Sequence, residues 1–121
     1  MESKKTLVVG ASQNPARYAY KAIHKLRYYN HSVVAVGLKE GLVDDVKIET
    51  GKPEFKELDT VTIYLGKDNQ KPLEDYILSL KPKRIIFNPG AENAELKQKA
   101  EVKEIECVEA CTLVMLTIGA Y

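Results

Sequence analysis

The sequence predicts an α/β fold in which a doubly wound parallel sheet of five to six strands carries helices on both faces. Short apolar runs alternate with amphipathic helical patterns along the chain, and glycine or proline follows most of the apolar runs. Strands that alternate with helices form parallel sheets with right-handed crossovers. No tandem repeat or low-complexity stretch interrupts this alternation in the 121 residues, so we expect one domain spanning 1–121.

The first strand and helix are predicted within residues 6–30. Leu7-Val8-Val9 is a β-prone apolar run that Gly10 ends. Asn14 is expected to cap a helix that begins at Pro15, because asparagine favours N-caps and proline favours the first helical position. Plotted at about 100° per residue, the apolar side chains fall on one side of this helix: Ala16, Ala19, Ala22, Ile23 and Leu26.

The same alternation predicts the remaining elements. Asn30 suits the left-handed residue after the first helix, and Pro82 ends the second helix. In chain order we expect a strand at 32–36, a very short strand around 46–49, a strand at 60–65, a helix at 70–80, a strand at 84–87, a helix at 94–102 and a strand at 105–108. Residues 112–118 fit either a buried helix or a further strand, and the preceding Glu109-Ala110 favours the helix.

Composition and charge disfavour several classes of partner. With 18 basic and 17 acidic side chains the net charge is +1, so no overall field attracts nucleic acid or an anionic membrane. No apolar run approaches the roughly 18 residues of a membrane-spanning helix, and the residues before the first strand leave no room for a signal peptide. We therefore expect a cytoplasmic protein that binds neither nucleic acid nor membranes.

The chain has two cysteines, Cys107 and Cys111, and two histidines, His24 and His31. The cysteines are not a Cys-x-x-Cys redox pair, and no spacing among these residues suggests a zinc site. We therefore expect buried, reduced thiols and no metal. The alternative for a cysteine is a reactive thiol near the ligand site.

Four glycine-containing loops are expected to converge at one edge of the sheet: Gly10-Ala11-Ser12, Gly37-Leu38-Lys39, Leu65-Gly66-Lys67 and Asn88-Pro89-Gly90. Open α/β sheets bind ligands at this edge, outside the carboxyl ends of their parallel strands. The turn into the first helix also offers backbone N–H groups and a positive helix end, which favour phosphate. Of the dinucleotide motif G-x-G-x-x-G only Gly10 is present, because Ser12 and Pro15 occupy the other glycine positions. By spacing alone, a phosphate-binding loop and a plain strand-to-helix connection both remain open.

The residue after the second strand normally distinguishes cofactors. NAD-binding folds place an acidic residue there to hold the ribose hydroxyls. Here the first charged residue is Lys39, which suits a phosphorylated ribose, as in NADP or the 3′-phosphate of coenzyme A. An exposed loop lysine without a ligand is the alternative.

With these loops in place, the chain resembles the small single-domain CoA-binding proteins related to the N-terminal domain of the succinyl-CoA synthetase alpha subunit. The most specific part is Val8-Val9-Gly10-Ala11-Ser12-Gln13-Asn14-Pro15, which is similar to the opening segment of that family. Gly37-Leu38-Lys39 stands where the family has an Asn-Pro-Lys-like turn, so the lysine is kept. Residues 88–93 are similar to the family's glycine-containing loop, and Cys111 matches a cysteine near the C-terminus of its members.

The resemblance implies a Rossmann-like domain that binds CoA or an acyl-CoA without a covalent bond. It places the phosphates near Gly10 to Asn14 and the phosphoribosyl end near Lys39. Taking the loops and the start of the first helix together, we expect ligand contacts from Gly10, Ala11, Ser12, Asn14, Arg17, Tyr18, Gly37, Leu38, Lys39, Leu65, Gly66, Asn88, Pro89 and Gly90.

No nucleophile or acid/base pair is aimed at this site, which favours a non-catalytic binding module, a sensor or carrier, over an enzyme. Two weaker hypotheses give chemistry to Glu92, as a loop carboxylate, and to Cys111, as a thiol that forms a mixed disulfide with CoA. One alternative function is an NADP- or other nucleotide-binding domain that serves a partner enzyme. Another is a ligand-free interaction protein whose apolar C-terminal run forms a homodimer interface.

Overall fold

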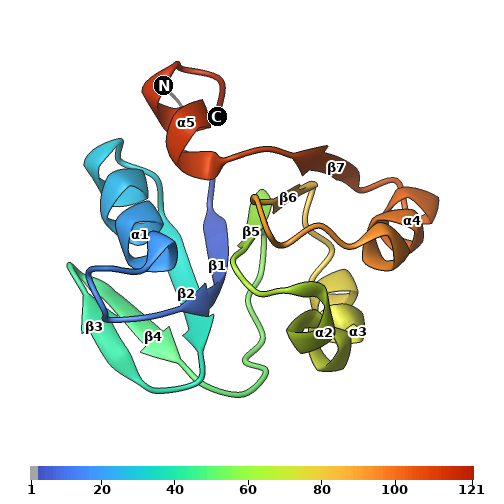
Figure 1. Ribbon diagram of the computed structural model, residues 1–121, viewed down its shortest axis with the longest axis horizontal. Coiled ribbons are helices and arrows are strands. Elements are labelled where there is room, and N and C mark those ends of the chain that lie inside the picture. Colours follow the sequence, from blue (N-terminus) through green and yellow to red (C-terminus); the bar gives the residue numbers. More distant parts are fainter. Residues whose placement is uncertain (1–2) are drawn as a thin grey trace.

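The computed structural model describes residues 3–121, which form a seven-stranded sheet with helices on both faces (Figure 1). The strands are β1 (Thr6–Ala11), β2 (Val33–Gly37), β3 (Gly41–Val43), β4 (Val46–Glu49), β5 (Thr60–Ile63), β6 (Arg84–Phe87) and β7 (Glu106–Glu109). The helices are α1 (Tyr18–Tyr28), α2 (Lys67–Gln70), the 3₁₀ turn η1 (Lys71–Leu73), α3 (Glu74–Ser79), α4 (Ala94–Val102) and α5 (Thr112–Thr117). The predicted α/β class is therefore confirmed.

The strand order is β3-β4-β2-β1-β5-β6-β7, and all neighbours pair in parallel except β3 with β4. The chain builds outward from β1 to β2 and β4, and then returns to place β5, β6 and β7 on the other side of β1. Apart from β3, this order is that of Rossmann dinucleotide-binding sheets. The topological switch point, where such folds bind ligands, lies between β1 and β5.

The sheet has one strand more than the predicted five to six, because Gly41–Val43 pairs with β4 as an antiparallel edge hairpin. A run of three residues that begins with glycine carries too little β signal to be recognised in sequence. Its placement is tertiary: the Gln13 side-chain oxygen accepts a hydrogen bond from the Leu42 N–H at 3.1 Å. A Cβ on Gly41 would lie 2.3 Å from the Gln13 side chain, so only glycine leaves room for this contact.

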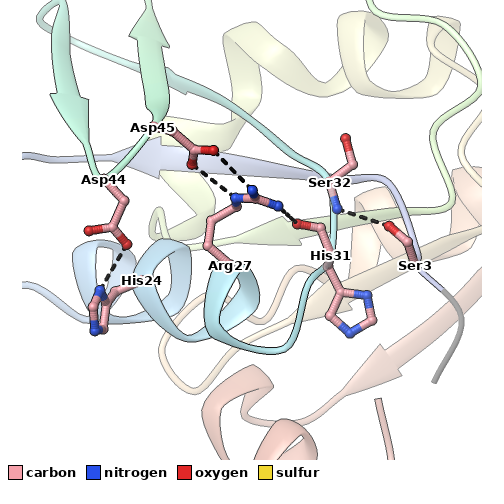
Figure 2. Close-up of polar contacts among 7 residues, drawn as sticks. All are labelled: Ser3, His24, Arg27, His31, Ser32, Asp44 and Asp45. Atoms are coloured by element: carbon pink, nitrogen blue, oxygen red, sulfur yellow. Dashed lines mark hydrogen bonds and ion pairs between the residues drawn. The ribbon is translucent and has the colours of Figure 1, made fainter.

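Two aspartates of the β3–β4 turn anchor the hairpin to α1 (Figure 2). Arg27 makes a bidentate pair with Asp45, with both N–O distances at 2.9 Å, and His24 contacts Asp44 at 2.8 Å. The Arg27 guanidinium lowers the pKa of the Asp45 carboxyl. Arg27 also donates to the His31 carbonyl oxygen at 2.7 Å, which ties the end of α1 to the chain that enters β2.

Each face of the sheet is covered by its own apolar cluster. Helices α1 and α5 pack on one face, and α3 and α4 pack on the other, as the separation of these helices in Figure 1 shows. On the α1 side, Ile23, Leu26 and Leu116 are buried against the sheet. On the opposite side, Ile77 and Leu96 are fully buried. This double burial explains why the strand sequences are almost continuously apolar.

The first helix begins at Tyr18 and not at Pro15, so the prediction of Asn14 as its N-cap is wrong. The Asn14 side-chain oxygen instead accepts a hydrogen bond from the Ala16 N–H at 3.0 Å, and its carbonyl oxygen accepts from Arg17 at 2.9 Å. These bonds close a separate turn before the helix. Ala16 is consequently exposed, although the helical pattern placed it on the buried side.

The predicted helix at 70–80 is divided into α2, η1 and α3. Pro72 has no N–H to donate, and a 3₁₀ turn takes the place of a continuous α-helix around it. The helical region also starts earlier than predicted, at Lys67 after the N-cap Gly66. By contrast, the bounds of β6 and α4 agree with the prediction, α5 is the expected C-terminal helix, and Asn30 has the expected left-handed φ of 66°.

Candidate functional site

A cleft of about 900 Å³ lies at the carboxyl edge of the sheet, over the switch point between β1 and β5. Its walls come from the loops after β1, β2, β5 and β6, which are the four loops that the sequence predicted to converge. The lining residues are Gly10, Ala11, Ser12, Gln13, Asn14, Ala16, Arg17, Tyr18, Ala19, Leu38, Lys39, Tyr64, Leu65, Gly66, Asn69, Pro89, Gly90 and Ala91.

Gly10 allows β1 to approach β5 closely at the base of the cleft. Its φ of +88° lies in the left-handed region that favours glycine. A Cβ at this position would lie 3.0 Å from the side chain of Leu65 and 3.2 Å from the carbonyl carbon of Tyr64. The glycine therefore serves both the turn and the close contact between two walls of the cleft.

The loop between β1 and α1 is held by short-range hydrogen bonds, and it leads into an open helix end. The Ser12 hydroxyl accepts from the Asn14 N–H at 3.0 Å. The N-cap residue of α1, Arg17, makes no side-chain capping bond, and the first turn of α1 contains no acidic residue. The first N–H groups of this eleven-residue helix are thus available to an anion in the cleft.

Charge in the cleft is of one sign. Arg17 and Lys39 are both exposed in the lining, and neither forms an ion pair with any residue from 3 to 121. The lining contains no aspartate or glutamate among the residues described. A protein with a net charge of only +1 therefore concentrates uncompensated positive charge at this edge.

Two apolar side chains stand at the rim beside these cations. Tyr18 is 66% exposed and Leu38 is 96% exposed. Both lie next to a cation in sequence, Tyr18 after Arg17 and Leu38 before Lys39. Exposed flat and aliphatic groups at a cleft entrance suit a ligand that carries an apolar ring next to anionic groups.

Gly37 and Asn88 are the two predicted residues that the structure places outside the cleft lining. A Cβ on Gly37 would lie 2.3 Å from the Ala11 carbonyl oxygen, so this glycine lets β2 approach β1. Asn88 is 2% exposed. Its side-chain nitrogen donates to Thr62 Oγ1 at 2.7 Å and the Ile63 carbonyl oxygen at 2.9 Å, and its oxygen accepts from the Thr112 N–H at 2.8 Å. Asn88 thus joins β5, β6 and the start of α5 beneath the cleft.

All the other predicted residues line the cleft, together with six that sequence reasoning missed: Gln13, Ala16, Ala19, Tyr64, Asn69 and Ala91. The sequence predicts Tyr64 within a strand at 60–65, but β5 ends at Ile63. It predicts that Asn69 precedes a helix, whereas Asn69 lies within α2. The sequence signal that could have found Asn69 is Gly66, whose position after an apolar run suits a helix N-cap.

The lining has few groups for acid/base or nucleophilic chemistry. Among the residues described it contains no histidine, cysteine or carboxylate. Burial raises the pKa of the Tyr64 hydroxyl, so this group stays a neutral phenol at physiological pH. Lys39 and the hydroxyl groups of Ser12 and Tyr18 remain, and the described lining places no histidine or carboxylate beside them as a general base.

The histidines and cysteines lie away from the cleft lining. His24 contacts Asp44, and the Nδ1 atom of His31 accepts a hydrogen bond from the Lys4 N–H at 2.9 Å. Cys107 and Cys111 are half-buried free thiols, and burial raises the pKa of Cys107 to about 11. Across residues 3–121, no cluster of His, Cys, Asp and Glu is placed to hold a metal ion. Nor does any helix in that range have the length and apolar character needed to cross a membrane.

Several solved structures are similar to the chain. An uncharacterised protein of known crystal structure is 45% identical over 100% of both chains, with a TM-score of 0.97. A Thermus thermophilus protein is 18% identical over 98% of this chain and 91% of its own, with a TM-score of 0.85. A hypothetical protein from Pyrococcus horikoshii OT3 is 20% identical over 93% of this chain and 80% of its own, with a TM-score of 0.79. The last two share the fold.

A family comparison agrees with the geometry of the cleft. No curated protein matches the chain. The family described as the CoA binding domain matches residues 4–117, which includes every strand and every helix of the described residues. By this match, the chain belongs to the CoA-binding domain family.

Proposed function

We propose that the cleft binds CoA or an acyl-CoA without a covalent bond, with the phosphates at the β1–α1 turn and the 3′-phosphorylated ribose near Lys39. The observation that carries this proposal is the charge of the cleft: Arg17, Lys39 and the uncapped start of α1 face it, and no carboxylate among the described residues lines it. CoA carries a pyrophosphate and a 3′-phosphate. These are the groups that such a site stabilises.

The two sides of the cleft suit the two halves of this ligand. Lys39 follows β2 on one side of β1, and Gly66 and Gly90 follow β5 and β6 on the other. A ligand whose pyrophosphate lies over Gly10 extends its nucleotide toward Lys39. Its pantetheine arm, which carries amide groups and the thiol, then extends across the loops after β5 and β6.

We propose that binding is non-catalytic, so that the protein acts as a sensor or carrier of the thioester. The support is the lining, in which Tyr64 is a neutral phenol and Ser12 lacks a neighbouring base. Glu92 has no assigned chemistry in this proposal, because it lies outside the cleft lining and its carboxylate accepts the Gly90 N–H at 2.9 Å. Its place outside the lining is consistent with a role in shaping the loop.

The test is parallel isothermal titration of the protein with CoA, dephospho-CoA and NADP⁺. We expect CoA to bind and dephospho-CoA to bind about five- to thirtyfold more weakly, which corresponds to about 1–2 kcal/mol for a solvent-exposed charge-assisted contact. Lys39→Ala should remove this difference, whereas Lys52→Ala, an exposed loop lysine outside the cleft lining, should not. Equal affinities of the wild type for CoA and dephospho-CoA would refute the role of Lys39.

Lys39 equally favours a second candidate, an NADP- or other nucleotide-binding domain that serves a partner enzyme, because NADP also has a phosphorylated ribose. The same titration decides between the two. NADP⁺ binding tighter than CoA would replace the first proposal with the second.

The surface of α5 favours a homodimer in addition to ligand binding. Thr112 and Leu116 are buried against the sheet, but Val114 and Ile118 are 54% and 68% exposed. One side of the apolar C-terminal run therefore belongs to the core, and the other side is an exposed apolar surface that a second copy of the chain would cover. Light scattering coupled to size exclusion should give twice the monomer mass of 13.6 kDa, and Val114→Glu should restore the monomer. A monomer in the wild type at concentrations up to about 1 mM would contradict this arrangement.

A further inference from the structure

Gln70, at the end of α2, connects two loops through its side-chain amide. It is fully buried, and its amide nitrogen donates two hydrogen bonds, each of 2.7 Å, to the carbonyl oxygens of Leu65 and Ala91. Leu65 follows β5, and Ala91 follows β6, and both line the cleft. One side chain outside the lining thus links the two loops that form one wall of the cleft.

The orientation of the Gln70 amide is fixed by its neighbours. Asn93 is 4% exposed, and its side-chain nitrogen donates to Gln70 Oε1 and Glu74 Oε2, both at 3.0 Å. Lys99 donates to the other carboxylate oxygen of Glu74 at 3.1 Å. Because Asn93 offers an N–H to Oε1, the Gln70 nitrogen must face the two carbonyl groups. Only an amide provides an acceptor at one end and two donors at the other.

These bonds determine which backbone groups the wall presents to a ligand. In a trans peptide the carbonyl and the following N–H point in opposite directions. With the Leu65 carbonyl turned toward Gln70, the N–H of Gly66 points away from Gln70. Gly66 lines the cleft, and its N–H donates no hydrogen bond to any residue from 3 to 121, so this N–H is free for a ligand. The wall therefore offers a backbone donor to a carbonyl-bearing ligand arm.

We infer that Gln70 is a positioning residue that fixes the wall receiving the pantetheine or acyl arm of the ligand, and so contributes to selectivity for CoA over its nucleotide fragment. This inference rests on the proposed function, since it assigns the arm to the loops after β5 and β6. Pantetheine has two amide carbonyls, and a thioester adds a third. An oriented Gly66 N–H matches such an acceptor, whereas the nucleotide half lies on the other side of β1.

The test compares Gln70→Leu with Tyr76→Phe. Gln70→Leu removes both donors at similar side-chain volume. Tyr76→Phe removes a comparable buried hydrogen bond in the same helical layer, from the Tyr76 hydroxyl to the Pro53 carbonyl oxygen, which lies outside the cleft lining. Gln70→Asn is the milder second variant, since its amide can still pair with Asn93 but is one methylene too short to reach both loops.

Two measurements are made on each variant. Amide hydrogen exchange without ligand should accelerate about tenfold or more in residues 65–66 and 90–92 of Gln70→Leu and Gln70→Asn, and stay unchanged there in Tyr76→Phe. Titration should show about tenfold weaker binding of CoA, equivalent to about 1.4 kcal/mol, with less than about a twofold change for adenosine 3′,5′-bisphosphate, which lacks the arm.

If the Gln70 variants lose equal binding affinity for CoA and for adenosine 3′,5′-bisphosphate, the inference is overturned, because such a result would mean a general loss of structure. Unchanged loop exchange in both Gln70 variants would also overturn it. If the wild type binds neither molecule, the proposed function fails. The exchange data then decide separately whether Gln70 holds the two loops.

Discussion

Gly10 combines two constraints that a set of glycine-to-alanine variants can separate. Gly10→Ala places a methyl group where φ is +88° and where Leu65 side-chain atoms lie 3.0 Å away. Gly51 has a φ of +77°, and a methyl group there would meet no atom within 4 Å, so Gly51→Ala tests the backbone constraint alone. Neither constraint applies to Gly66→Ala, because φ at Gly66 is −64° and a methyl group there would meet no atom within 4 Å.

The expected losses of unfolding free energy follow from these differences. A left-handed alanine costs about 1–2 kcal/mol, partly offset by the smaller backbone entropy of the unfolded chain, so Gly51→Ala should lose about 0.5–1 kcal/mol. Crowding against Leu65 and the Tyr64 backbone adds about 1–3 kcal/mol, so Gly10→Ala should lose about 1.5–4 kcal/mol in total. Gly66→Ala should change stability by less than about 0.5 kcal/mol.

Urea unfolding followed by far-ultraviolet circular dichroism measures these values, with the m-value as a check that the same surface is exposed. A loss of unfolding free energy below about 1 kcal/mol for Gly10→Ala would refute the reasoning, because it would mean that β1 and β5 can move apart at little cost in free energy. A Gly51→Ala loss as large as that of Gly10→Ala would instead assign the whole effect to the backbone angle.

Three further predictions concern buried polar groups. Asn88→Ala should lower the unfolding free energy by about 2–4 kcal/mol, because it removes three buried hydrogen bonds. Thermal or urea unfolding measures this value. Asn69 is exposed, so a loss for Asn88→Ala no larger than that for Asn69→Ala would contradict the prediction. Burial by itself would raise the pKa of the Glu74 carboxyl, but hydrogen bonds from Asn93 and Lys99 outweigh burial, and the pKa in the folded protein is below the ordinary 4.5. The ionised Glu74 therefore stabilises the fold above pH 4.5, and this stabilisation is lost as the pH falls through the pKa of the folded protein. Glu74→Gln should therefore flatten the pH dependence of the urea midpoint below about pH 4.5, and an unchanged slope would exclude Glu74 as its source. Burial, with the charges of Lys4 and Arg84, lowers the pKa of His31 below 6.5, so stability is full above pH 6.5 and falls as the unfolded histidine gains its proton. His31→Phe should reduce that loss between about pH 7 and 5, and a steeper loss in the variant would disprove the assignment.

The convergence of the four loops was predictable because it depends only on the alternation of strands and helices. Parallel strands bring their carboxyl ends to one edge whatever side chains they carry, so the loops containing Gly10, Lys39, Gly66 and Gly90 could be assigned to one site before their geometry was known. That the first charged residue after β2 is Lys39, and not an acidic residue, was also visible in the sequence, and this lysine is part of the positive charge that the cleft presents.

Contacts between distant segments were not predictable in this way. Asn88 follows a strand in a loop that contains Gly90, as a ligand-binding residue would, yet its amide is buried and hydrogen-bonded to Thr62 and Thr112. Gln70 lies at the start of a helical pattern that gave no reason to single it out. Its role depends on where the folded chain places the carbonyl groups of Leu65 and Ala91, which are five and 21 residues away in the sequence.

The sequence by itself determined the α/β class, most of the strands and the set of loops at the ligand edge, because hydrophobic periodicity and glycine turns are local signals. The tertiary structure alone decided the added strand Gly41–Val43, the start of α1 at Tyr18 and the division between Asn88, which is buried, and Lys39, which faces the cleft. The physical reason is that an amide or a short strand is stable wherever partners satisfy its hydrogen bonds, and those partners come from distant parts of the chain.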